Sequence, residues 1–187
     1  MRTAHMFGPF GTAAGYDRLT HKRLRGLRGR IVADVAAAEL GAGDRVLDAG
    51  TGPGRLPLAI AESRPELAVE GVDLSADMID HARHTDSAGR VTFTVADVAD
   101  MPFPDATFAL VVSSLSQHHW TDVEGALRDL RRVLRPGGRL WIYDVRFALK
   151  RAERAARETF GPTAVERAPV RIGRFPVRLM ARLTAQA

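Results

Sequence analysis

A glycine-rich loop between two carboxylates holds the residue types and spacings that point most directly to chemistry in this chain. Asp48 ends an apolar segment, and the loop Gly50-Thr51-Gly52-Pro53-Gly54 follows almost at once. Glycines let a backbone turn sharply and approach a ligand that a Cβ would block. Asp73 comes about 20 residues after the loop, the spacing at which a carboxylate binds ribose hydroxyls in nucleotide-binding folds. The pattern therefore predicts a site for a nucleoside-containing cofactor.

The details of the loop separate two classes of cofactor. The third glycine of a dinucleotide fingerprint comes one position early here, and Arg55 stands where a small residue would allow tight helix packing. Asp48 lies at the mouth where NAD would place its pyrophosphate, and two negative charges repel each other there. S-adenosylmethionine carries an ammonium and a sulfonium and no phosphate, so the same carboxylate would attract it. The sequence favours S-adenosylmethionine over NAD as the cofactor.

Two further side chains fit the adenine end of such a cofactor. Asp97 follows the expected third strand, where its carboxylate can accept a hydrogen bond from an adenine amino group. Met78 lies in the helix after Asp73, and its polarizable side chain suits packing on the adenine ring. A methionine at this helical spacing is as readily an ordinary core residue, so both interpretations stay open.

The elements that must position these residues alternate between short apolar strands and helical stretches. This alternation predicts an α/β protein with a doubly wound, parallel sheet and helices on both faces. Strands are expected at 45–48, 68–72, 90–95, 108–113 and 139–143, and helices at 16–40, 55–63, 75–84, 122–134 and 147–160. The stretch 135–138, Arg-Pro-Gly-Gly, is expected to end a helix. Past residue 162, segments 164–172 and 177–184 predict a terminal hairpin with Gly173 and Pro176 between them.

Length and composition are those of one globular domain. The 187 residues are enough for a single core that buries roughly 70% of the unfolded surface. We expect a helical cap at 1–43, a cofactor-binding core at 44–146 and a helix with a hairpin at 147–187. No apolar run approaches the ~18 residues of a membrane span, and no secretory signal is recognisable. The chain has no cysteine, which excludes disulfides, thiolate catalysis and cysteine-bound zinc and fits a reducing cytoplasm.

The net charge of +5 is concentrated in the last forty residues or so. Arginines recur there every three or four positions within a segment, at Arg167, Arg171, Arg174, Arg178 and Arg182. Such a row could face an anionic partner. Because the chain has only two lysines, arginine is also simply its ordinary surface cation, and a solvated face is the plainer interpretation.

Taken together, the motifs resemble class I S-adenosylmethionine-dependent methyltransferases over about residues 44–146. Residues 46–54 (Val-Leu-Asp-Ala-Gly-Thr-Gly-Pro-Gly), 71–78 (Gly-Val-Asp-Leu-Ser-Ala-Asp-Met) and 96–97 (Ala-Asp) are similar to the first cofactor motifs of that family. The later segments 103–108, 111–114, 118–120 and 134–140 resemble the small-molecule branch that includes the ubiquinone/menaquinone methyltransferases, of methyltransferase type 11. No single motif is decisive, but their joint order and spacing are specific.

The resemblance implies a Rossmann-like sheet of seven strands whose last strand is antiparallel. It also implies that S-adenosylmethionine is held by the loop around Gly50, Thr51 and Gly52 at its methionine end. Asp73, with Leu74 beside it, would bind the ribose, and Asp97 with the amide of Val98 would bind the adenine. The backbone at Ser113 would meet the ammonium. Tyr16, in Gly15-Tyr16-Asp17, would close over the methionine end, as similar N-terminal tyrosines do.

The methyl acceptor is harder to predict. His118 and His119 follow the fourth strand at the edge where ligands bind, and one of them could deprotonate a hydroxyl, an amine or a carbon acid. The plainer interpretation is that they only shape the loop by hydrogen bonding, and Trp120 is more readily a core residue than an acceptor wall. The chain has no long insertion after the fifth strand, so the N-terminal segment or a second subunit, as in a homodimer, would have to close a deep pocket. No metal site is expected.

Three functions remain open at this point. The first is a methyltransferase that acts on oxygen, carbon or nitrogen of a small molecule, and it is favoured. The second is an RNA or protein methyltransferase that docks through the basic tail, and the third is a noncatalytic, cofactor-binding regulatory subunit. The family's Pro-Pro-Tyr motif, typical of nucleic-acid and amino-group methylation, is absent at 113–116, which reads Ser-Ser-Leu-Ser. Direct methylation of nucleic-acid bases therefore loses support.

Overall fold

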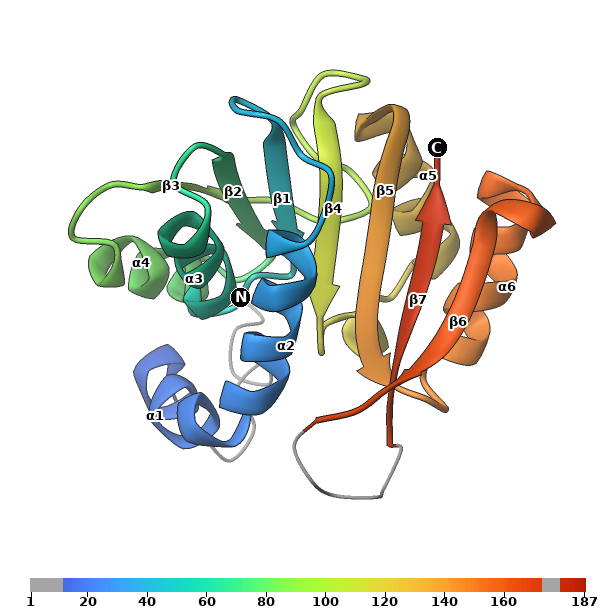
Figure 1. Ribbon diagram of the computed structural model, residues 1–187. Coiled ribbons are helices and arrows are strands. Elements are labelled where there is room, and N and C mark those ends of the chain that lie inside the picture. Colours follow the sequence, from blue (N-terminus) through green and yellow to red (C-terminus); the bar gives the residue numbers. More distant parts are fainter. Residues whose placement is uncertain (1–11, 173–178) are drawn as a thin grey trace.

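Seven strands form one sheet in the computed structural model, which describes residues 12–172 and 179–187 (Figure 1). The spatial order is β3-β2-β1-β4-β5-β7-β6. The first five strands are parallel, and β7 runs antiparallel to both of its neighbours. The strands are β1 (Arg45–Ala49), β2 (Ala68–Asp73), β3 (Val91–Val95), β4 (Phe108–Ser114), β5 (Leu134–Val145), β6 (Val165–Val170) and β7 (Met180–Gln186). The predicted doubly wound sheet with an antiparallel last strand is confirmed.

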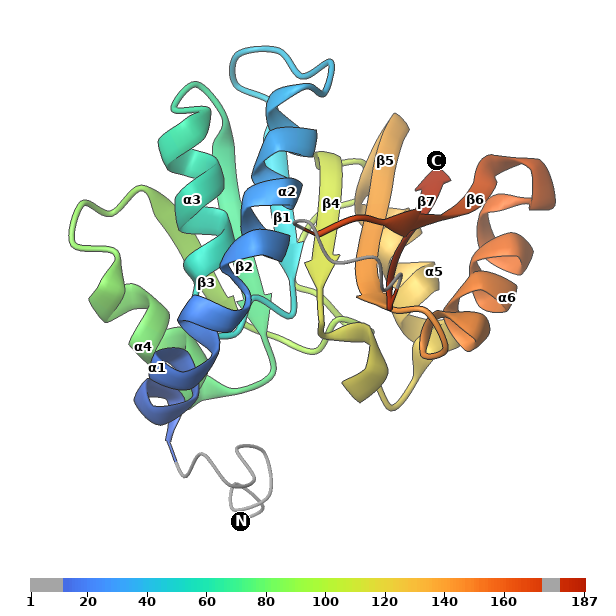
Figure 2. The same ribbon diagram turned by 60° about the horizontal axis from the view of Figure 1, so that its bottom comes forward.

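Helices cover both faces of the sheet, and each face has its own apolar core (Figures 1 and 2). On one face lie α2 (Arg25–Ala36), α3 (Arg55–Ser63) and α4 (Ala76–Thr85). On the other lie α5 (Val123–Val133) and α6 (Leu149–Phe160). Strands β1 and β4 are in the middle, and they are almost continuously apolar because both of their faces are covered. No helix among the described residues is long and apolar enough to cross a membrane.

The prediction of one continuous helix at 16–40 is wrong. The structure has two helices, α1 (Ala13–Arg23) and α2, separated at Leu24, whose φ of −91° and ψ of 0° leave the helical region. Helix α2 buries Leu27, Ile31 and Val35 on the sheet, whereas α1 packs on α4. No glycine or proline stands at position 24 to indicate the break in the sequence. The break arises because the two helices pack on different surfaces.

Strand β5 begins five residues earlier than predicted. The stretch 135–138, expected to end a helix, lies within the strand, and Leu134 pairs with Phe108 before a register shift leads into the regular ladder. Gly137 adopts a φ of +75°, and its N–H donates to the carbonyl of Ala187. The glycine pair thus allows an irregular strand start instead of a turn.

The predicted terminal hairpin is confirmed as β6 and β7, although β7 starts three residues later than expected. Gly173 and Pro176 of its predicted turn lie outside the described residues, as do Arg174 and Arg178. The remaining elements are short 3₁₀ helices, η2 (Gln117–His119) after β4 and η3 (Pro162–Ala164) after α6.

Candidate functional site

The residues expected to do chemistry gather at one edge of the sheet. In parallel strands the carboxyl ends share an edge, and ligands of open α/β sheets bind there. Asp48 and Asp73 lie at or next to the ends of β1 and β2, and His118 follows β4. Figure 2 brings this carboxyl edge toward the viewer, with η2 and the segment that joins β5 to α6 side by side.

The glycine loop leaves one open place on its surface. Gly50, Gly52 and Gly54 all have positive φ, of 76°, 54° and 76°. A Cβ at Gly50 would overlap the side chain of Ser116, and one at Gly54 would lie 2.8 Å from the Cβ of Ala82. At Gly52 a Cβ would meet nothing within 4 Å. Two of the glycines therefore serve packing inside the protein, whereas Gly52 borders free space that a ligand can occupy.

Asp48 is a buried carboxylate with only one of its oxygens in use. Its side chain is 2% exposed, and Oδ2 accepts a hydrogen bond of 2.8 Å from the hydroxyl of Thr51. Oδ1 has no partner among the described residues. Burial raises the pKa of Asp48 to about 7; the Thr51 hydrogen bond lowers it and the charge of Asp73 raises it. A buried oxygen without a hydrogen-bond partner is rare in proteins. A cationic ligand at this position would supply the partner that Oδ1 of Asp48 lacks.

Asp73 ties the glycine loop to the end of β2. Its Oδ2 accepts from the N–H of Gly52 at 2.8 Å, and its Oδ1 accepts from the N–H of Ser75 at 2.9 Å. Burial raises the pKa of the Asp73 carboxyl, although these two hydrogen bonds and the charge of His119 oppose the rise. Each oxygen keeps a further lone pair, so the carboxylate can still accept from two vicinal hydroxyls.

Beyond Asp73 the edge becomes apolar, as an adenine would require. Leu74 is 61% exposed, and Val95 at the end of β3 is 45% exposed. Asp97 uses Oδ1 to accept from the N–H of Ala99, which leaves Oδ2 available. The Val98 side chain is buried in the core, so only its backbone can meet a ligand. The structure therefore brings Leu74 and Asp97 together at the carboxyl edge of β2 and β3.

Met78 of α4 and Tyr16 of α1 lie together where these two helices pack. Met78 is buried with Ala13, and the ring of Tyr16 packs against this small cluster. The core interpretation of Met78 thus has direct support in its contacts. Burial raises the pKa of the Tyr16 hydroxyl, and the negative charge of Asp73 raises it further. Tyr16 is therefore close enough to the ribose-binding candidate to sense its charge.

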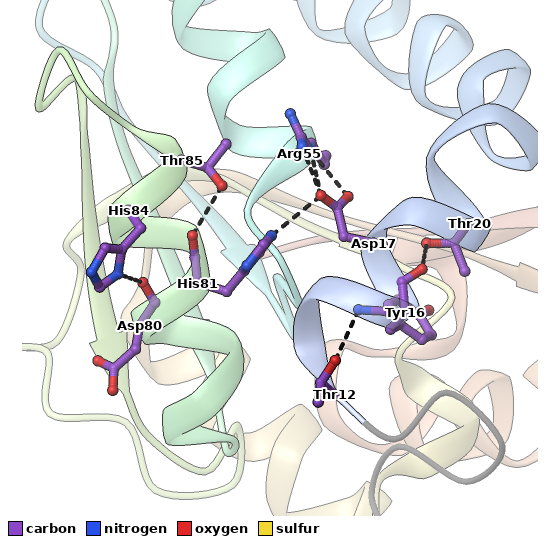
Figure 3. Close-up of polar contacts among 10 residues, drawn as sticks. Thr12, Tyr16, Asp17, Thr20, Arg55, Asp80, His81, His84 and Thr85 are labelled. Atoms are coloured by element: carbon purple, nitrogen blue, oxygen red, sulfur yellow. Dashed lines mark hydrogen bonds and ion pairs between the residues drawn. The ribbon is translucent and has the colours of Figure 1, made fainter.

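Polar contacts of Asp17 hold α1 against α3 and α4 at this edge of the sheet (Figure 3). Arg55 at the start of α3 donates to its carboxylate through Nε at 3.0 Å and through a terminal nitrogen at 2.6 Å, and Nε2 of His81 in α4 lies 3.2 Å away. Asp17 is 5% exposed. Burial acts to raise the pKa of Asp17, but the hydrogen bonds and charges of Arg55 and His81 outweigh it, so the pKa is lowered. Arg55, which breaks the dinucleotide pattern, has its use here.

Ser113 and Gln117 add two further orphaned polar groups near the end of β4. Both side chains are buried, and neither Oγ of Ser113 nor Oε1 of Gln117 has a partner within the described part of the chain. Leu115 between them has a φ of +53°, a strained backbone for a leucine. Ser113 is 0% exposed as a whole residue, so the expected contact of its backbone with a ligand stays a prediction.

His118 is held by a fully buried carboxylate. Its Nδ1 lies 3.0 and 2.9 Å from the two carboxylate oxygens of Asp144, and its backbone N–H donates to the same group at 3.3 Å. Asp144 is 0% exposed. Because a carboxylate accepts hydrogen bonds, a neutral His118 in this contact has its proton on Nδ1 and its lone pair on Nε2. This is the arrangement of a general base whose ring is oriented by an acid.

His119 and Trp120 have different surroundings. The ring centroid of His119 lies 4.0 Å from that of His118. Burial lowers the pKa of His119, and His118 lowers it further, while Asp144 and Asp73 act in the opposite direction. The Nε1–H of Trp120 donates to Ser116, and its ring packs on the α5–α6 core, which favours the core interpretation of this tryptophan.

The sequence patterns do not single out Asp144 or Asp17. The strand expected before Asp144 ends at Tyr143, so the carboxylate comes one residue past the strand end, at the ligand edge. That position is a usable signal, since an acid there is placed like Asp48 and Asp73. For Asp17 the sequence holds no local signal, because its partners Arg55 and His81 are 38 and 64 residues away.

The strand order, the antiparallel β7 and the glycine loop after β1 define the class of protein. They are the Rossmann-like fold of the class I methyltransferases. In this class S-adenosylmethionine is the methyl donor.

The chain belongs to the class I S-adenosylmethionine-dependent methyltransferases, and residues 46–138 match the family described as a methyltransferase domain. It is 39% identical over 109 residues to the 27-O-demethylrifamycin SV methyltransferase of Amycolatopsis mediterranei, a match that covers 56% of this chain and 40% of the relative. It is 38% identical over 107 residues to a ubiquinone/menaquinone biosynthesis C-methyltransferase of Geobacter sulfurreducens, covering 54% and 42%. The match spans less than half of either relative.

Solved structures agree with the fold over a larger part of the chain. A methyltransferase of Aquifex aeolicus described as dependent on S-adenosylmethionine superposes with a TM-score of 0.71 at 16% identity, covering 93% of this chain and 97% of the other. The complex of a Haloferax volcanii methyltransferase activator, Trm112, with a methyltransferase gives a TM-score of 0.74 at 21% identity, covering 94% and 95%. At these identities the likeness shows the fold.

Proposed function

We propose that this protein transfers a methyl group from S-adenosylmethionine to an oxygen, carbon or nitrogen atom of a small organic molecule. The observation that carries the proposal is the partnerless, buried oxygen of Asp48 beside the open surface of Gly52. A buried carboxylate with an elevated pKa in a loop that borders open space is suited to a cation.

The other residues of the edge would each bind a different part of the cofactor. Asp73 would accept from both ribose hydroxyls, and Leu74 with Val95 would flank the adenine, to which Asp97 offers a free oxygen. The backbone of Ser113 and the carboxylate of Asp48 would face the ammonium end. Tyr16 on α1 would cover the site. Bound there, S-adenosylmethionine supplies a methyl group already activated by its sulfonium, so the protein contributes mainly alignment and proximity.

His118 is our candidate for the base. As the acceptor atom gains the methyl group, Nε2 of His118 takes the proton that this atom loses. Asp144 keeps Nδ1 protonated and stabilises the imidazolium that results. An acceptor whose attacking atom carries no proton would leave this pair without a chemical step, so the pair favours hydroxyl, amine or acidic carbon acceptors.

The names of the two relatives support a small organic acceptor. One is named for O-methylation of a demethylated rifamycin, and the other for C-methylation in quinone biosynthesis. The acceptor atom differs between them, and the histidine–aspartate pair suits either kind.

Calorimetric titration of the protein tests the proposal. We expect S-adenosylmethionine and S-adenosylhomocysteine to bind and NAD not to bind. Asp73→Asn should weaken binding of the first two by roughly tenfold or more, since it loses the charge and one of two acceptors. Asp86→Asn is the control, because Asp86 is a buried carboxylate at the end of α4, where it accepts from the N–H of Val91. Absence of binding by the wild type would refute the proposal, and equal affinity of Asp73→Asn would refute the ribose assignment.

A further inference from the structure

Two strongly exposed apolar side chains lie at the carboxyl edge on the β5 side. Phe147 is 73% exposed and Leu179 is 62% exposed. The strand register brings them together, because Val145 at the end of β5 pairs with Met180 at the start of β7. With Arg146, Lys150 and Arg167 they line a hollow of about 320 Å³. This volume falls at the lower end of the range for small-molecule sites.

The charge around this hollow is positive. Arg146 and Lys150 form no ion pair with any described residue, and Arg167 shares the carboxylate of Glu153 with Arg157. Arg171 is exposed just past the end of β6, whose Val170 pairs with the same Met180. One acid thus stands among several cations. Exposed, unpaired cations beside exposed apolar side chains complement a ligand that is anionic and apolar at once.

The elements that line the hollow pack against the element that carries the candidate base. Phe147 follows Asp144 by three residues, and Asp144 holds His118. Helix α6, which carries Lys150, packs against η2, which carries His118. Figure 2 shows the segment between β5 and α6 beside η2, on the side of the sheet away from β2 and β3. A molecule seated in the hollow therefore lies on the opposite side of His118 from the ribose-binding candidates.

We propose that the methyl acceptor is a small amphipathic anion, with an apolar body on Phe147 and Leu179 and a carboxylate, sulfonate or phosphate facing Arg146 and Lys150. This inference rests on the proposed function and adds the class of acceptor to it. A membrane surface of anionic lipid would meet the same residues, but among the described residues only two apolar side chains are strongly exposed there, and they border a concave hollow. Both features favour a single small molecule.

Dodecanoate is a suitable probe, because it joins an apolar chain to one carboxylate. Titrated into the whole protein with S-adenosylhomocysteine present, it should bind saturably, and dodecyltrimethylammonium, of the same chain length and opposite charge, should not. Phe147→Ser and Lys150→Glu should each weaken dodecanoate binding by roughly tenfold. Lys22→Glu changes the chain's other lysine, exposed on α1, and should leave the affinity within about twofold of the wild type.

Several outcomes would overturn the inference. Failure of dodecanoate to bind, equal binding of dodecyltrimethylammonium, or unchanged affinity in both variants would each do so. Sedimentation with phosphatidylglycerol vesicles but not with phosphatidylcholine vesicles, without dodecanoate binding, would assign the surface to a membrane instead. Binding of S-adenosylmethionine in the same preparations separates the two proposals: if it persists while dodecanoate fails, only the acceptor class is wrong, and if it is absent, the proposed function is wrong as well.

Discussion

The two halves of the carboxyl edge hold their polar groups in different ways. On the β1–β2 side, Asp73 is fixed by two backbone N–H groups, and Asp48 by a hydroxyl three residues away. On the β4–β5 side, His118 depends on one buried side chain, Asp144, which is 26 residues distant. The β1–β2 side, which holds the proposed cofactor residues and is called the cofactor half below, therefore depends largely on backbone contacts. The β4–β5 side, which holds the candidate base and is called the acceptor half, depends on side chains. Substitutions should alter the second half with little effect on the first.

The largest effect that would separate the halves is expected from Asp144→Asn. An asparagine can turn its amide toward Nδ1 of His118 and move the ring proton to Nε2, which removes the base. We expect methyl transfer to a proton-bearing acceptor to fall by roughly 100-fold or more, with the affinity for S-adenosylmethionine within about twofold of the wild type. Turnover and calorimetry measure the two quantities. A parallel loss of cofactor affinity would show that the halves are not separate.

Asp48 gives the cofactor half a pH dependence with a definite sign. Because its folded pKa is about 7, the carboxyl is protonated below neutral pH, and ionisation must precede the binding of a cation. We expect the affinity for S-adenosylmethionine to rise by up to about tenfold per unit from about pH 5 to about pH 7 and then to level off. Asp48→Asn should bind weakly and without this rise.

The same elevated pKa of Asp48 predicts how the free energy of unfolding of the ligand-free protein depends on pH. The folded state holds the Asp48 proton after the unfolded state has lost it, so the free energy of unfolding should fall between about pH 4 and about pH 7. Asp86→Asn serves as the control in both experiments, since Asp86, at the end of α4, is another buried carboxylate with one oxygen that has no partner among the described residues. If Asp86→Asn abolishes the pH dependence and Asp48→Asn keeps it, the assignment to Asp48 fails.

Gly52→Ala sharpens the contrast between backbone and side chains. The new methyl group would fill the open place on the loop, and we expect the affinity for S-adenosylmethionine to drop by roughly tenfold while His118 and Asp144 stay in place. Gly89→Ala is matched to it, because Gly89 has a φ of +60°, against +54° at Gly52, and equal free space. Both variants should lose about 1 kcal/mol of stability from the left-handed backbone. Equal cofactor affinity in the two variants would mean that nothing binds against Gly52.

The smallest effect is expected from Asp17→Asn, which weakens the fastening of α1. The variant keeps a hydrogen-bond acceptor for Arg55 but loses the charge, so we expect a cost of about 1–2 kcal/mol in the free energy of unfolding. Cofactor affinity should fall only a few-fold, because Tyr16 loses some of its order. Arg30→Gln, which breaks a surface pair with Asp34 in α2, should cost less than about 0.5 kcal/mol. Chemical denaturation compares the two.

The loss in Asp17→Asn should itself depend on pH. The pKa of Asp17 is lowered in the folded protein, so its contribution to stability is present above the unfolded pKa of about 4 and disappears as the pH falls through the folded value. Wild type and variant should therefore converge in stability at low pH. A difference that persists unchanged in acid would assign the effect to packing.

The same division explains what the sequence could predict. Helix α3, strands β1 and β2 and the carboxylates Asp48 and Asp73 follow from local patterns, since glycines, apolar runs and strand ends lie within a few residues of them. The break at Leu24 and the early start of β5 depend on contacts made far along the chain. The helical pattern at 16–40 does not indicate that α1 packs on α4. A Pro-Gly-Gly stretch predicts a turn, and only its pairing with a strand distant in sequence makes it part of β5.

The site divides in the same manner. The glycine loop and Asp73 are recognisable by spacing alone, and both histidines by their place after β4. The partners that give His118 and Tyr16 their positions are Asp144 and Asp17, and these belong to interactions across 26 to 64 residues. Neither pairing produces a periodic or compositional pattern in the sequence, because an acidic side chain at any of several positions could reach the same partner.

The packing of Gly50 against Ser116 joins the two halves and limits how such proteins diverge. A side chain on residue 50 would displace Ser116 and with it η2, which carries His118. A lineage that replaced this glycine would keep His118 in place only if residue 116 also became smaller or moved away. Substitutions at positions 50 and 116 should therefore be inherited together, and the first loop of the cofactor half sets which loops the acceptor half can evolve.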